Sequence, residues 1–504
     1  MNRKHLLLLL LIFLSVIALR LYFALRSPYF SDDQAYFVQR QVEHIAKTGL
    51  PLFYDPLSYG GRVLVFLPLF YYSLAIFAWF MPVSLVLKII PNIFASLLVF
   101  VIYAITMRLA NNPKIGIITA AISAAVPIYV SQTVNGASIY SLIMPLLFLT
   151  VYFFMRIGEK KVYTTLLVAC FFVLVFTDAI VVVLVFALII YLILAKVEGL
   201  KTERSELELA LFLLFFAIWS YFIIFKKLFI SYGSALVWQN IPSELLSQYF
   251  QKITIVGAMN QIGLVPLLAG IYIFYKYIFQ LKNKTIYLLI SFAISVSLLL
   301  WLKLVAFDGG LIILGIILVL LLGQFLKVAL NYVQKTKLAE LPAYPFVLSG
   351  SLLIIFVVTS VLPTLFYTDR EIRMGFDEGD IQAMLWLRNS TNTNDVVLGT
   401  LRDGHLITSV AQRPNVMDSN FLLIPNINQR LKDLKTIFTT SSEIEAVNLL
   451  TQYKVQYIYF SKFAKLTYKR TSLPYTDDIN CFQLVYDSEQ YQVYKTKCKL
   501  EKLD

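Results

Sequence analysis

The stretch Phe30-Ser31-Asp32-Asp33-Gln34-Ala35-Tyr36-Phe37 decides how the fold of this chain is interpreted. It follows closely on the apolar run Leu6–Leu25, which is long enough to cross a membrane. Two adjacent carboxylates just beyond a membrane span are costly unless they have a polar role or open water beside them. For an isolated Asp-Asp pair a solvated acidic loop is the simpler interpretation. A functional role for the pair therefore has to be argued from the rest of the chain.

Composition places the chain among integral membrane proteins. Of its 504 residues, 59% are hydrophobic and only 14% are charged, whereas soluble domains carry roughly a quarter charged residues. The formal net charge is +13, but the Lys and Arg residues form short clusters between apolar runs. This pattern is typical of cytoplasmic loops under the positive-inside rule, and it differs from the basic stripe of a nucleic-acid-binding protein. We therefore expect a multi-pass protein of the cell membrane and no nucleic-acid partner.

The apolar runs predict a polytopic α-helical protein with about eleven spans and one interfacial or re-entrant helix. Leu6–Leu25 follows a basic start and has no small-residue cleavage site after it, which favours an uncleaved first span with a cytoplasmic N-terminus. Whether Val63–Met81 crosses the membrane is ambiguous. If it crossed, the basic Arg108–Lys114 loop and most later basic loops would face outward. The positive-inside rule therefore favours a run that does not cross. The other predicted spans are Asn92–Leu109, Ile115–Val130, Tyr140–Met155, Val162–Phe176, Ala179–Ala195, Leu207–Phe225, Val256–Phe279, Ile286–Trp301, Leu311–Leu326 and Tyr344–Phe366.

The chain becomes polar at Tyr367, after the last predicted span. We expect a membrane domain over residues 1–366, with a first outer loop at 26–90, and an extracytoplasmic α/β or α+β domain over residues 367–504. The elements predicted in this domain are a helix at Ile381–Arg388, strands at Val396–Gly399 and Val455–Phe460, and a hairpin flanked by Cys481 and Cys498. The two cysteines predict either a disulfide, if the domain lies outside the cytosol, or two free thiols.

Under this topology, ionisable residues gather at the outer face of the membrane. Each alone needs no function, but their gathering around one long outer loop predicts a site. An active site on this side has no nucleotide donor, so its donor must be lipid-borne with a phosphate at headgroup level. Aspartate there can act as a general base, and Lys or Arg can hold the phosphate. The aromatic-rich run Leu64–Phe80 suits either a polyprenyl chain or ordinary helix packing.

The acidic pair Asp32-Asp33 is followed by Tyr36 and then by Gly49 at the end of a predicted helix. This arrangement resembles the first outer-loop signature of the GT-C glycosyltransferases, as found in the lipid-phosphate-mannose-type and aminoarabinose-type transferases. Further stretches resemble the catalytic subunits of archaeal oligosaccharyltransferases, including their segment with a Trp-Trp-Asp-Tyr-Gly motif. These stretches are Arg40–Glu43, Tyr54-Asp55-Pro56, Trp386–Thr391, Asp395–Leu398, Arg402–His405, Ala411–Pro414 and Asp418.

Two departures from the oligosaccharyltransferase pattern bear on function. Where that family has a second acidic motif, this chain has Asn135–Tyr140, with Ser138 and Tyr140 in place of acids. A divalent cation prefers several charged oxygen ligands, so the resemblance favours the metal-independent branch that moves one sugar from a polyprenyl monophosphate. The Trp-Trp-Asp-Tyr-Gly motif is reduced to Leu401–His405, which does not support recognition of an Asn-X-Ser/Thr peptide.

The resemblance implies inverting transfer of a sugar from a polyprenyl-phosphate donor to an extracytoplasmic glycan, lipid or protein acceptor. Asp33, or its neighbour Asp32, would be the catalytic base, and Asp33→Asn would abolish transfer. Arg20, Lys303 or Arg62 would contact the donor phosphate. The residues assigned to substrate binding are Arg20, Tyr36, Arg40, Arg62, Asp178, Glu244, Lys303 and Asp403.

Two alternatives stay open. One is a metal-dependent oligosaccharyltransferase-like enzyme, with Mg²⁺ or Mn²⁺ held by Asp33 and Glu244, joined by Asp178. The other is a catalytically silent relative that serves as a scaffold or as a transporter of lipid-linked saccharides. A transporter should show broken helices around a polar centre at mid-membrane, whereas this chain carries its ionisable residues at the ends of its spans.

Overall fold

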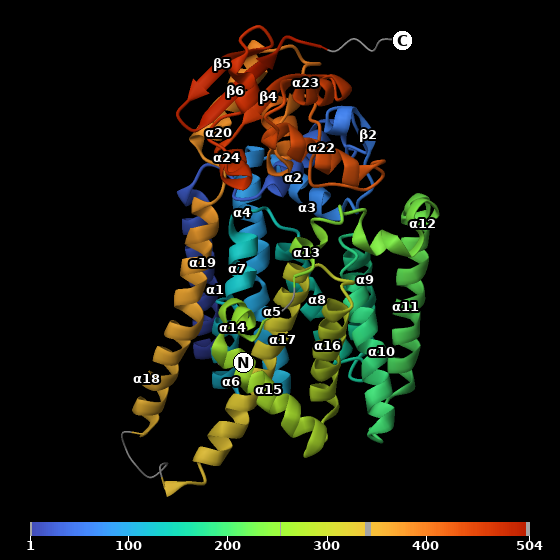
Figure 1. Ribbon diagram of the computed structural model, residues 1–504. Coiled ribbons are helices and arrows are strands. Elements are labelled where there is room, and N and C mark those ends of the chain that lie inside the picture. Colours follow the sequence, from blue (N-terminus) through green and yellow to red (C-terminus); the bar gives the residue numbers. More distant parts are fainter. Residues whose placement is uncertain (1–2, 252–253, 338–343, 500–504) are drawn as a thin grey trace.

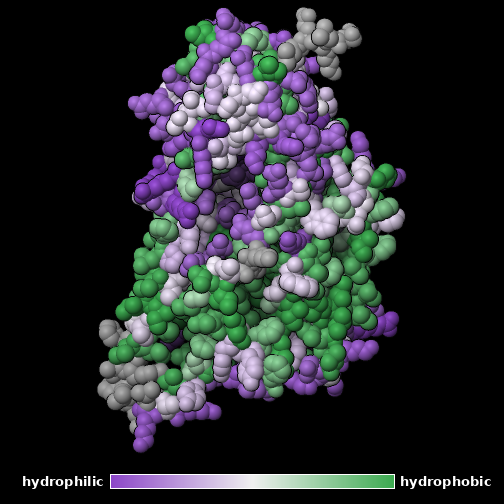
Figure 2. Space-filling model, in the orientation of Figure 1, coloured by the Kyte–Doolittle hydropathy of each residue, from purple (hydrophilic) through white to green (hydrophobic). Residues whose placement is uncertain are grey.

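The computed structural model describes residues 3–251, 254–337 and 344–499 of the chain. A bundle of long helices carries a smaller domain of strands and short helices at one end (Figure 1). On the face shown in Figure 2, the middle of the bundle is mostly hydrophobic, whereas the end domain is mostly hydrophilic. This division is expected of a membrane protein with one domain in water, because lipid-facing surfaces must be apolar.

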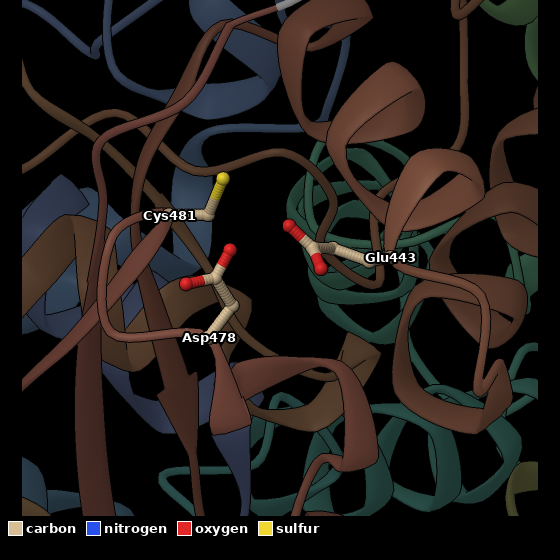
Figure 3. A group of neighbouring side chains, drawn as sticks. All are labelled: Glu443, Asp478 and Cys481. Carbon is tan, nitrogen blue, oxygen red and sulfur yellow. The ribbon is translucent and has the colours of Figure 1, made fainter.

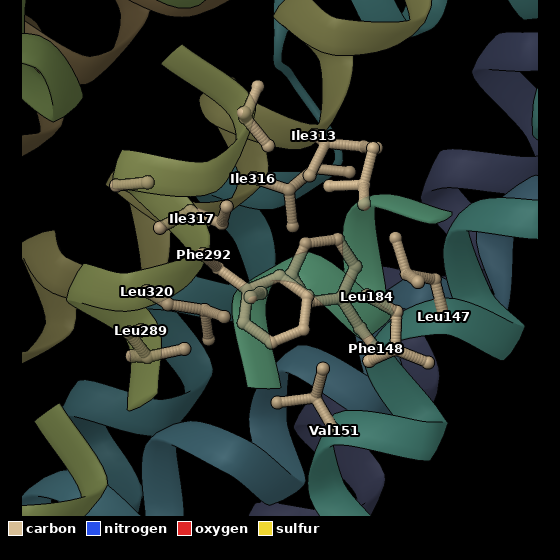
Figure 4. Packing of buried hydrophobic residues seen from close by; sticks show 14 of the residues in the cluster. Leu147, Phe148, Val151, Leu184, Leu289, Phe292, Ile313, Ile316, Ile317 and Leu320 are labelled. Atoms are coloured by element: carbon tan, nitrogen blue, oxygen red, sulfur yellow. The ribbon is translucent and has the colours of Figure 1, made fainter. Parts of the chain in front are cut away.

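The bundle is built around α17 (Phe307–Val333), which is buried along most of its length. A helix that is apolar on all sides is typical of the centre of a bundle. It packs against α16 (Lys284–Trp301), and α8 (Tyr140–Phe154) and α10 (Val181–Val197) contribute to the same buried cluster. Their buried Leu, Ile, Val and Phe side chains meet those of α17 in one continuous cluster (Figure 4).

Several further helices complete the bundle. They are α1 (Arg3–Arg26), α4 (Val83–Ser96), α5 (Leu98–Ala110), α6 (Pro113–Ser123), α7 (Pro127–Val134), α9 (Lys161–Val175), α11 (Arg204–Ile224), α14 (Ile255–Ile262), α15 (Leu264–Phe279), α18 (Tyr344–Phe356) and α19 (Leu362–Arg373). Within the described residues, six helices are long and apolar enough to cross a membrane, or up to eight if each of two bent pairs forms one span. Four more apolar helices have 10–17 residues. The count of eleven spans therefore stays a prediction.

The ambiguous run Val63–Met81 contains one short helix, α3 (Leu69–Ala78), of 10 residues. Such a helix is roughly 15 Å long, about half the thickness of the hydrocarbon core. It packs against α2 (Asp33–Thr48) and α4 at the end of the bundle that carries the C-terminal domain (Figure 1). The helix is too short to cross, which agrees with the non-crossing interpretation.

Two runs predicted as straight spans are bent. The Val256–Phe279 run divides into α14 and α15, which meet at 112°. Gly263 lies at the break with φ +104°, a conformation that other residues rarely adopt, so the bend is encoded by this glycine. The Ile115–Val130 run divides into α6 and α7, which meet at 51° just before Pro127.

The span predicted at Asn92–Leu109 begins earlier than expected. Its helix starts with α4 at Val83 and carries Lys88 and Pro91 inside. Lys88 falls in the first outer loop predicted at 26–90, but the structure buries this side chain and gives its ammonium four oxygen partners. Contacts made by the folded chain thus outweigh the local polarity.

The C-terminal domain contains one mixed four-stranded sheet in the order β3-β4-β6-β5. Its strands are β3 (Val396–Leu398), β4 (Val455–Phe460), β5 (Phe482–Ser488) and β6 (Tyr491–Thr496). β3 and β4 are parallel and the other pairs are antiparallel. The predicted strands and hairpin are therefore present. The main helices of the domain are α20 (Glu378–Ser390), α22 (Ile427–Thr439), α23 (Glu443–Gln452) and α24 (Lys462–Tyr468).

The predicted domain boundary at 366/367 falls inside α19, which continues to Arg373. Just beyond it, Phe376 joins a buried apolar cluster that contains residues of both the first outer loop and the C-terminal domain, among them Tyr36, Leu406 and Tyr459. The first outer loop also contains β1 (Tyr54–Asp55), η1 (Ser58–Gly60) and β2 (Arg62–Val63). This loop is therefore a structural support of the C-terminal domain.

The polar loop that follows α12 (Lys226–Tyr232) also reaches the C-terminal domain. The Asn240 side chain donates to the carbonyl oxygens of Phe421 at 2.8 Å and Ile424 at 3.0 Å. The first outer loop, this polar loop and the C-terminal domain therefore share one end of the molecule (Figure 1).

Cys481 and Cys498 form a disulfide at the base of the β5–β6 hairpin, and Cys170 is free. Because disulfides persist outside the cytosol, we predict that Cys170 alone reacts with maleimide when membranes are denatured without reductant. After reduction, all three cysteines of the chain should react, as mass spectrometry of the alkylated protein would show. Labelling of three thiols without reductant would contradict an extracytoplasmic domain.

Candidate functional site

Asp33 joins the first outer loop to the C-terminal domain. It is the first residue of α2, and its side chain is buried. Its Oδ2 accepts a hydrogen bond from the His405 amide at 3.2 Å, and its Oδ1 accepts one from the Leu406 amide at 3.0 Å. These amides belong to the short helix α21 (Gly404–Leu406). Burial, followed by the charge of Asp32, raises the pKa of Asp33 well above its ordinary value.

Asp32 is placed differently from its neighbour. It is the residue before α2, its carboxylate makes no capping bond to the helix, and it is exposed. The protein around it nevertheless removes enough water to raise its pKa, against the opposing effects of the Gln34 amide and of the charge of Arg402. A carboxylate that is both exposed and partly desolvated lines a hollow.

Asp32 lies near Tyr249, Asp308 and Glu371, and we call the space among these four side chains the outer hollow. The charge of Asp32 acts on each of the other three groups, and all three carboxylates are exposed. The lining residues come from the start of α2, the end of α13 (Leu246–Tyr249), the first turn of α17 and the last turn of α19. Figure 2 shows the surface recessed between the hydrophilic domain and the hydrophobic bundle.

Asp178 lies near the same region. It stands between α9 and α10, where its Oδ1 accepts a hydrogen bond from the Ile180 amide at 2.7 Å. Its charge acts on Tyr140 together with that of Asp308. Burial raises the pKa of Asp178 to about 6. Asp178 therefore caps the start of α10 and also adds a negative charge to the region around Asp308.

A second cavity, of about 110 Å³, lies between the first outer loop and the C-terminal domain. The Gln34 side chain lines it and donates to the Ser419 hydroxyl at 3.0 Å. Its remaining wall contains Phe37, Arg62, Leu64, Val65, Phe66, Tyr71, Gln239, Asn420, Phe421 and Leu422. Because Gln34 follows Asp33 directly, the cavity adjoins the acidic pair on the side of the C-terminal domain.

Arg62 holds the wall of this cavity in place. It is buried, stacks over the Tyr59 ring at 4.9 Å, donates to the Asn420 carbonyl oxygen and faces Asp418 at 3.6 Å. Although burial alone would raise the pKa of Asp418, His405, Arg62 and the hydroxyl of Ser58 lower it below its ordinary value. Burial lowers the pKa of His405. The carboxylate of Asp418 is thus the internal counter-ion of Arg62.

Four other predicted site residues make internal contacts, namely Arg20, Arg40, Tyr36 and Asp403. Arg20 is buried inside the bundle, where it donates to Asn92 and Thr133 and lies over the Tyr129 ring. Arg40 pairs with Asp55 at 2.5 Å. The Tyr36 ring packs edge-on against Phe30 and Phe376.

Asp403 is fully buried and accepts hydrogen bonds from the Thr400 amide, the Thr400 hydroxyl and the Ser461 hydroxyl. Its position therefore stabilises the turn before α21.

Glu244 and Lys303 are exposed. Glu244 lies 3.6 Å from Lys435, and the Lys303 carbonyl oxygen accepts a hydrogen bond from the Trp238 indole. Asp33 and Glu244 therefore have different partners, and the structure does not bring them together as ligands of one ion.

One group within the described residues has ligand atoms close enough together for a metal ion, namely Glu443, Asp478 and Cys481, which lie within 4.8 Å of one another (Figure 3). The sulfur of Cys481 is bonded to Cys498. A disulfide sulfur is not the thiolate that binds metals, and two carboxylates on the surface do not make a site. This group lies in the C-terminal domain and is separate from the acidic pair.

Sequence reasoning missed Glu371 and Arg402 as site residues and left Asp308 outside the assigned set. Asp308 and Glu371 lie 276 and 339 positions from Asp32, respectively, so no local pattern connects them. Arg402 donates to the carbonyl oxygens of Ser31 and Met374, which places its guanidinium beside the acidic pair. The position of Asp308 at the outer end of a span was the one available signal.

No protein-family model and no curated protein matches the chain, but solved structures do. The oligosaccharyltransferase AglB from Archaeoglobus fulgidus, in complex with an inhibitory peptide and a dolichol-phosphate, superposes with a TM-score of 0.72 at 15% identity, covering 98% of this chain and 74% of AglB. ArnT from Cupriavidus metallidurans bound to undecaprenyl phosphate gives 0.57 at 12% identity, with 98% of both chains covered. The mycobacterial arabinofuranosyltransferase AftD gives 0.57 at 12% identity, covering 97% of this chain and 40% of AftD.

The chain therefore has the fold of the GT-C glycosyltransferases. Both the outer-loop and the C-terminal resemblance seen in the sequence point to this fold. At 12–15% identity the likeness concerns the fold, and activity has to be argued from the site.

We predict that Asp33→Ala lowers the stability of the protein, because it leaves two buried amides without an acceptor. An unsatisfied buried donor costs about 1–3 kcal/mol, so the melting temperature of the purified protein should fall by several degrees. Glu244→Ala is the matched control, since its ion pair with Lys435 is exposed and such pairs contribute little. Equal melting temperatures for the two variants would contradict a stabilising role of the hydrogen bonds between Asp33 and the amides of His405 and Leu406.

Proposed function

We propose that this protein transfers a sugar from a polyprenyl-phosphate donor to an extracytoplasmic acceptor, with Asp32 as the general base. The supporting observation is the difference between the two aspartates. Both oxygens of Asp33 are engaged by backbone amides, whereas the carboxylate of Asp32 is exposed in the outer hollow and has a raised pKa. A raised pKa in a hollow is typical of a catalytic carboxylate.

We place the phosphate of the lipid-linked donor at the outer hollow. It lies between the hydrophobic bundle and the hydrophilic domain (Figure 2), so a prenyl tail in lipid and an acceptor in water can both reach it. The fold likeness supports this class of donor, since AglB and ArnT have solved structures with dolichol-phosphate and undecaprenyl phosphate. The exposed aromatic side chains of Trp79 and Phe80, just after α3, suit the membrane interface.

The reaction would be a single displacement. Asp32 takes the proton from the acceptor group, the acceptor atom forms a bond to the anomeric carbon, and the bond from that carbon to the phosphate oxygen breaks. The products are the glycosylated acceptor with an inverted anomeric centre, polyprenyl phosphate, and a protonated Asp32. Of the predicted phosphate ligands, Arg20 and Arg62 are occupied inside the protein, and the exposed Lys303 remains. We propose Arg402 as a second cation for this role, because it is only half-buried, its two hydrogen bonds use Nη2 alone, and its charge acts on Asp32.

The structure does not fit the metal-dependent alternative, in which Asp33 and Glu244, joined by Asp178, would hold the ion. One structure of A. fulgidus oligosaccharyltransferase is a complex with Zn and sulfate. In this chain Asp33 already accepts two backbone hydrogen bonds and Glu244 faces Lys435 at the surface. Asp33 and Glu244 therefore do not provide a shared ligand set, and we derive no step through a metal.

A catalytically silent relative remains the second hypothesis. The loss of acids at Ser138 and Tyr140 favours it, whereas an exposed carboxylate at Asp32 that does not cap its helix favours an enzyme. The two hypotheses differ in what a substitution at Asp32 does.

We predict that Asp32→Asn lowers transfer by at least about a hundredfold, the range that general-base catalysis supplies, without lowering the melting temperature. The assay uses synthetic undecaprenyl-phosphate monosaccharides, with mass spectrometry of the released lipid phosphate and the product. Glu208→Gln, an exposed carboxylate on α11 paired with Arg204, is the control. Unchanged transfer in Asp32→Asn would reject this base.

We predict that kcat/KM rises with pH through an inflection above the ordinary aspartate pKa of about 3.9. The base acts only when deprotonated, and its pKa is raised in the folded protein, so activity is lost as pH falls through that raised value. A pH–rate profile measured with a saturating acceptor tests this. An acid limb at or below the ordinary value would contradict the assignment.

A further inference from the structure

Lys88 is a buried lysine whose four hydrogen-bond partners are all neutral oxygens. It lies in α4 with 3% of its surface exposed. Its Nζ donates to the carbonyl oxygens of Ala24 at 2.8 Å, Ser27 at 2.5 Å and Tyr29 at 3.2 Å. The fourth partner is Asn135 Oδ1 at 3.0 Å. Burying an ammonium group is costly, so a position that only needed packing would gain more from an apolar residue such as methionine.

Three of these partners lie at the end of α1 or in the connection to α2. Ala24 belongs to the last turn of α1, which ends at Arg26, whereas Ser27 and Tyr29 lie beyond the helix. Capping of α1 therefore accounts for only one of the three bonds. The other two hold the chain immediately before Asp32.

Asn135 holds the same connection from the opposite side. Its Nδ2 donates to the Tyr29 carbonyl oxygen at 3.0 Å and to the Ser31 hydroxyl at 2.8 Å. Its own carbonyl oxygen accepts a hydrogen bond from the Ser31 amide at 3.3 Å. Because Oδ1 of Asn135 accepts from Lys88, the two side chains form one unit around residues 27–31.

We propose that Lys88 and Asn135 are positioning residues that set the location of Asp32 through the backbone before it. This inference rests on the proposed function, since it gives Asp32 the role of base. A general base must lie within hydrogen-bond reach of the proton it removes, and a displacement of about 1 Å can cost roughly a hundredfold in rate. The Asp32 side chain makes no capping hydrogen bond, and the amides that act on its carboxylate are those of the next two residues, Asp33 and Gln34, so its position depends on the backbone.

The location of residue 32 can be measured without any enzyme assay. A Cβ built on Gly136 lies 3.9 Å from the Cβ of Asp32, within the 3.5–4.5 Å span of a disulfide. The double variant Asp32→Cys/Gly136→Cys, in a Cys170→Ser background, should therefore oxidise rapidly in membranes. The rate is followed by alkylating the remaining thiols.

We expect Lys88→Met to slow this cross-link by about tenfold or more, and Lys88→Arg, which keeps donors for the carbonyls, to restore part of the rate. Lys327→Met is the matched control, because Lys327 donates to the Leu109 carbonyl oxygen at the end of another helix. If Lys88→Met does not insert in the membrane, Asn135→Ala is measured in its place. The proposal is overturned if Lys88→Met cross-links as fast as the parent. If Asn135→Ala is measured instead, the same outcome in that variant overturns it.

Transfer kinetics then separate this inference from the proposed function. With Asp32 and Gly136 intact, Lys88→Met should lower kcat by about tenfold or more, with KM for an undecaprenyl-phosphate sugar within about twofold and partial rescue by Lys88→Arg. A slowed cross-link with unchanged kcat would show that Lys88 positions residue 32 but that this residue is not the base. A lowered kcat with an unchanged cross-link would overturn the positioning role and leave the base assignment standing.

Discussion

The outer end of this protein depends on the hydrogen bonds from the backbone of α21 to the carboxylate of Asp33. They attach the start of α2 to the C-terminal domain, and the apolar face of α2 shares a buried cluster with that domain. Asp32 precedes the helix and has an extended backbone. Its carboxylate therefore does not follow that of Asp33 into the domain, and it is exposed in the outer hollow. One carboxylate of the pair thus serves the structure, and the other is the base that we propose.

Buried cations and exposed carboxylates lie on different sides of this contact. Below it, inside the bundle, Arg20 and Lys88 are buried against neutral oxygens of α1, α4 and α7. Asn92 connects the two cations, since it accepts from Arg20 and donates to the carbonyl oxygen of Lys88. Buried polar groups that are fully hydrogen-bonded fix one arrangement. This network holds the end of the first span, while the carboxylates of the hollow remain accessible.

The fold and the site contribute different arguments. A shared fold with AglB, ArnT and AftD shows what architecture the chain adopts, but one architecture can host several chemistries. The proposed sugar transfer therefore depends on one exposed aspartate between lipid and water. Residues that a resemblance alone would assign to substrate, such as Arg20 and Asp403, are occupied by internal hydrogen bonds. Their chemistry suits a site, but their partners place them in the framework.

The sequence by itself determined the membrane class, the polar C-terminal domain, its strands and hairpin, and the run Val63–Met81 inside the first outer loop, which is expected not to cross. Each follows from composition or from hydrophobic periodicity within a short window, which local physics sets. Only the tertiary structure decided which aspartate is engaged, that Lys88 lies inside a helix, and that Asp308 and Glu371 join Asp32. Those outcomes depend on contacts between distant residues, such as Asp33 and His405, which are 372 positions apart. No pattern along the chain encodes such a pairing, because its energy exists only once the two segments meet.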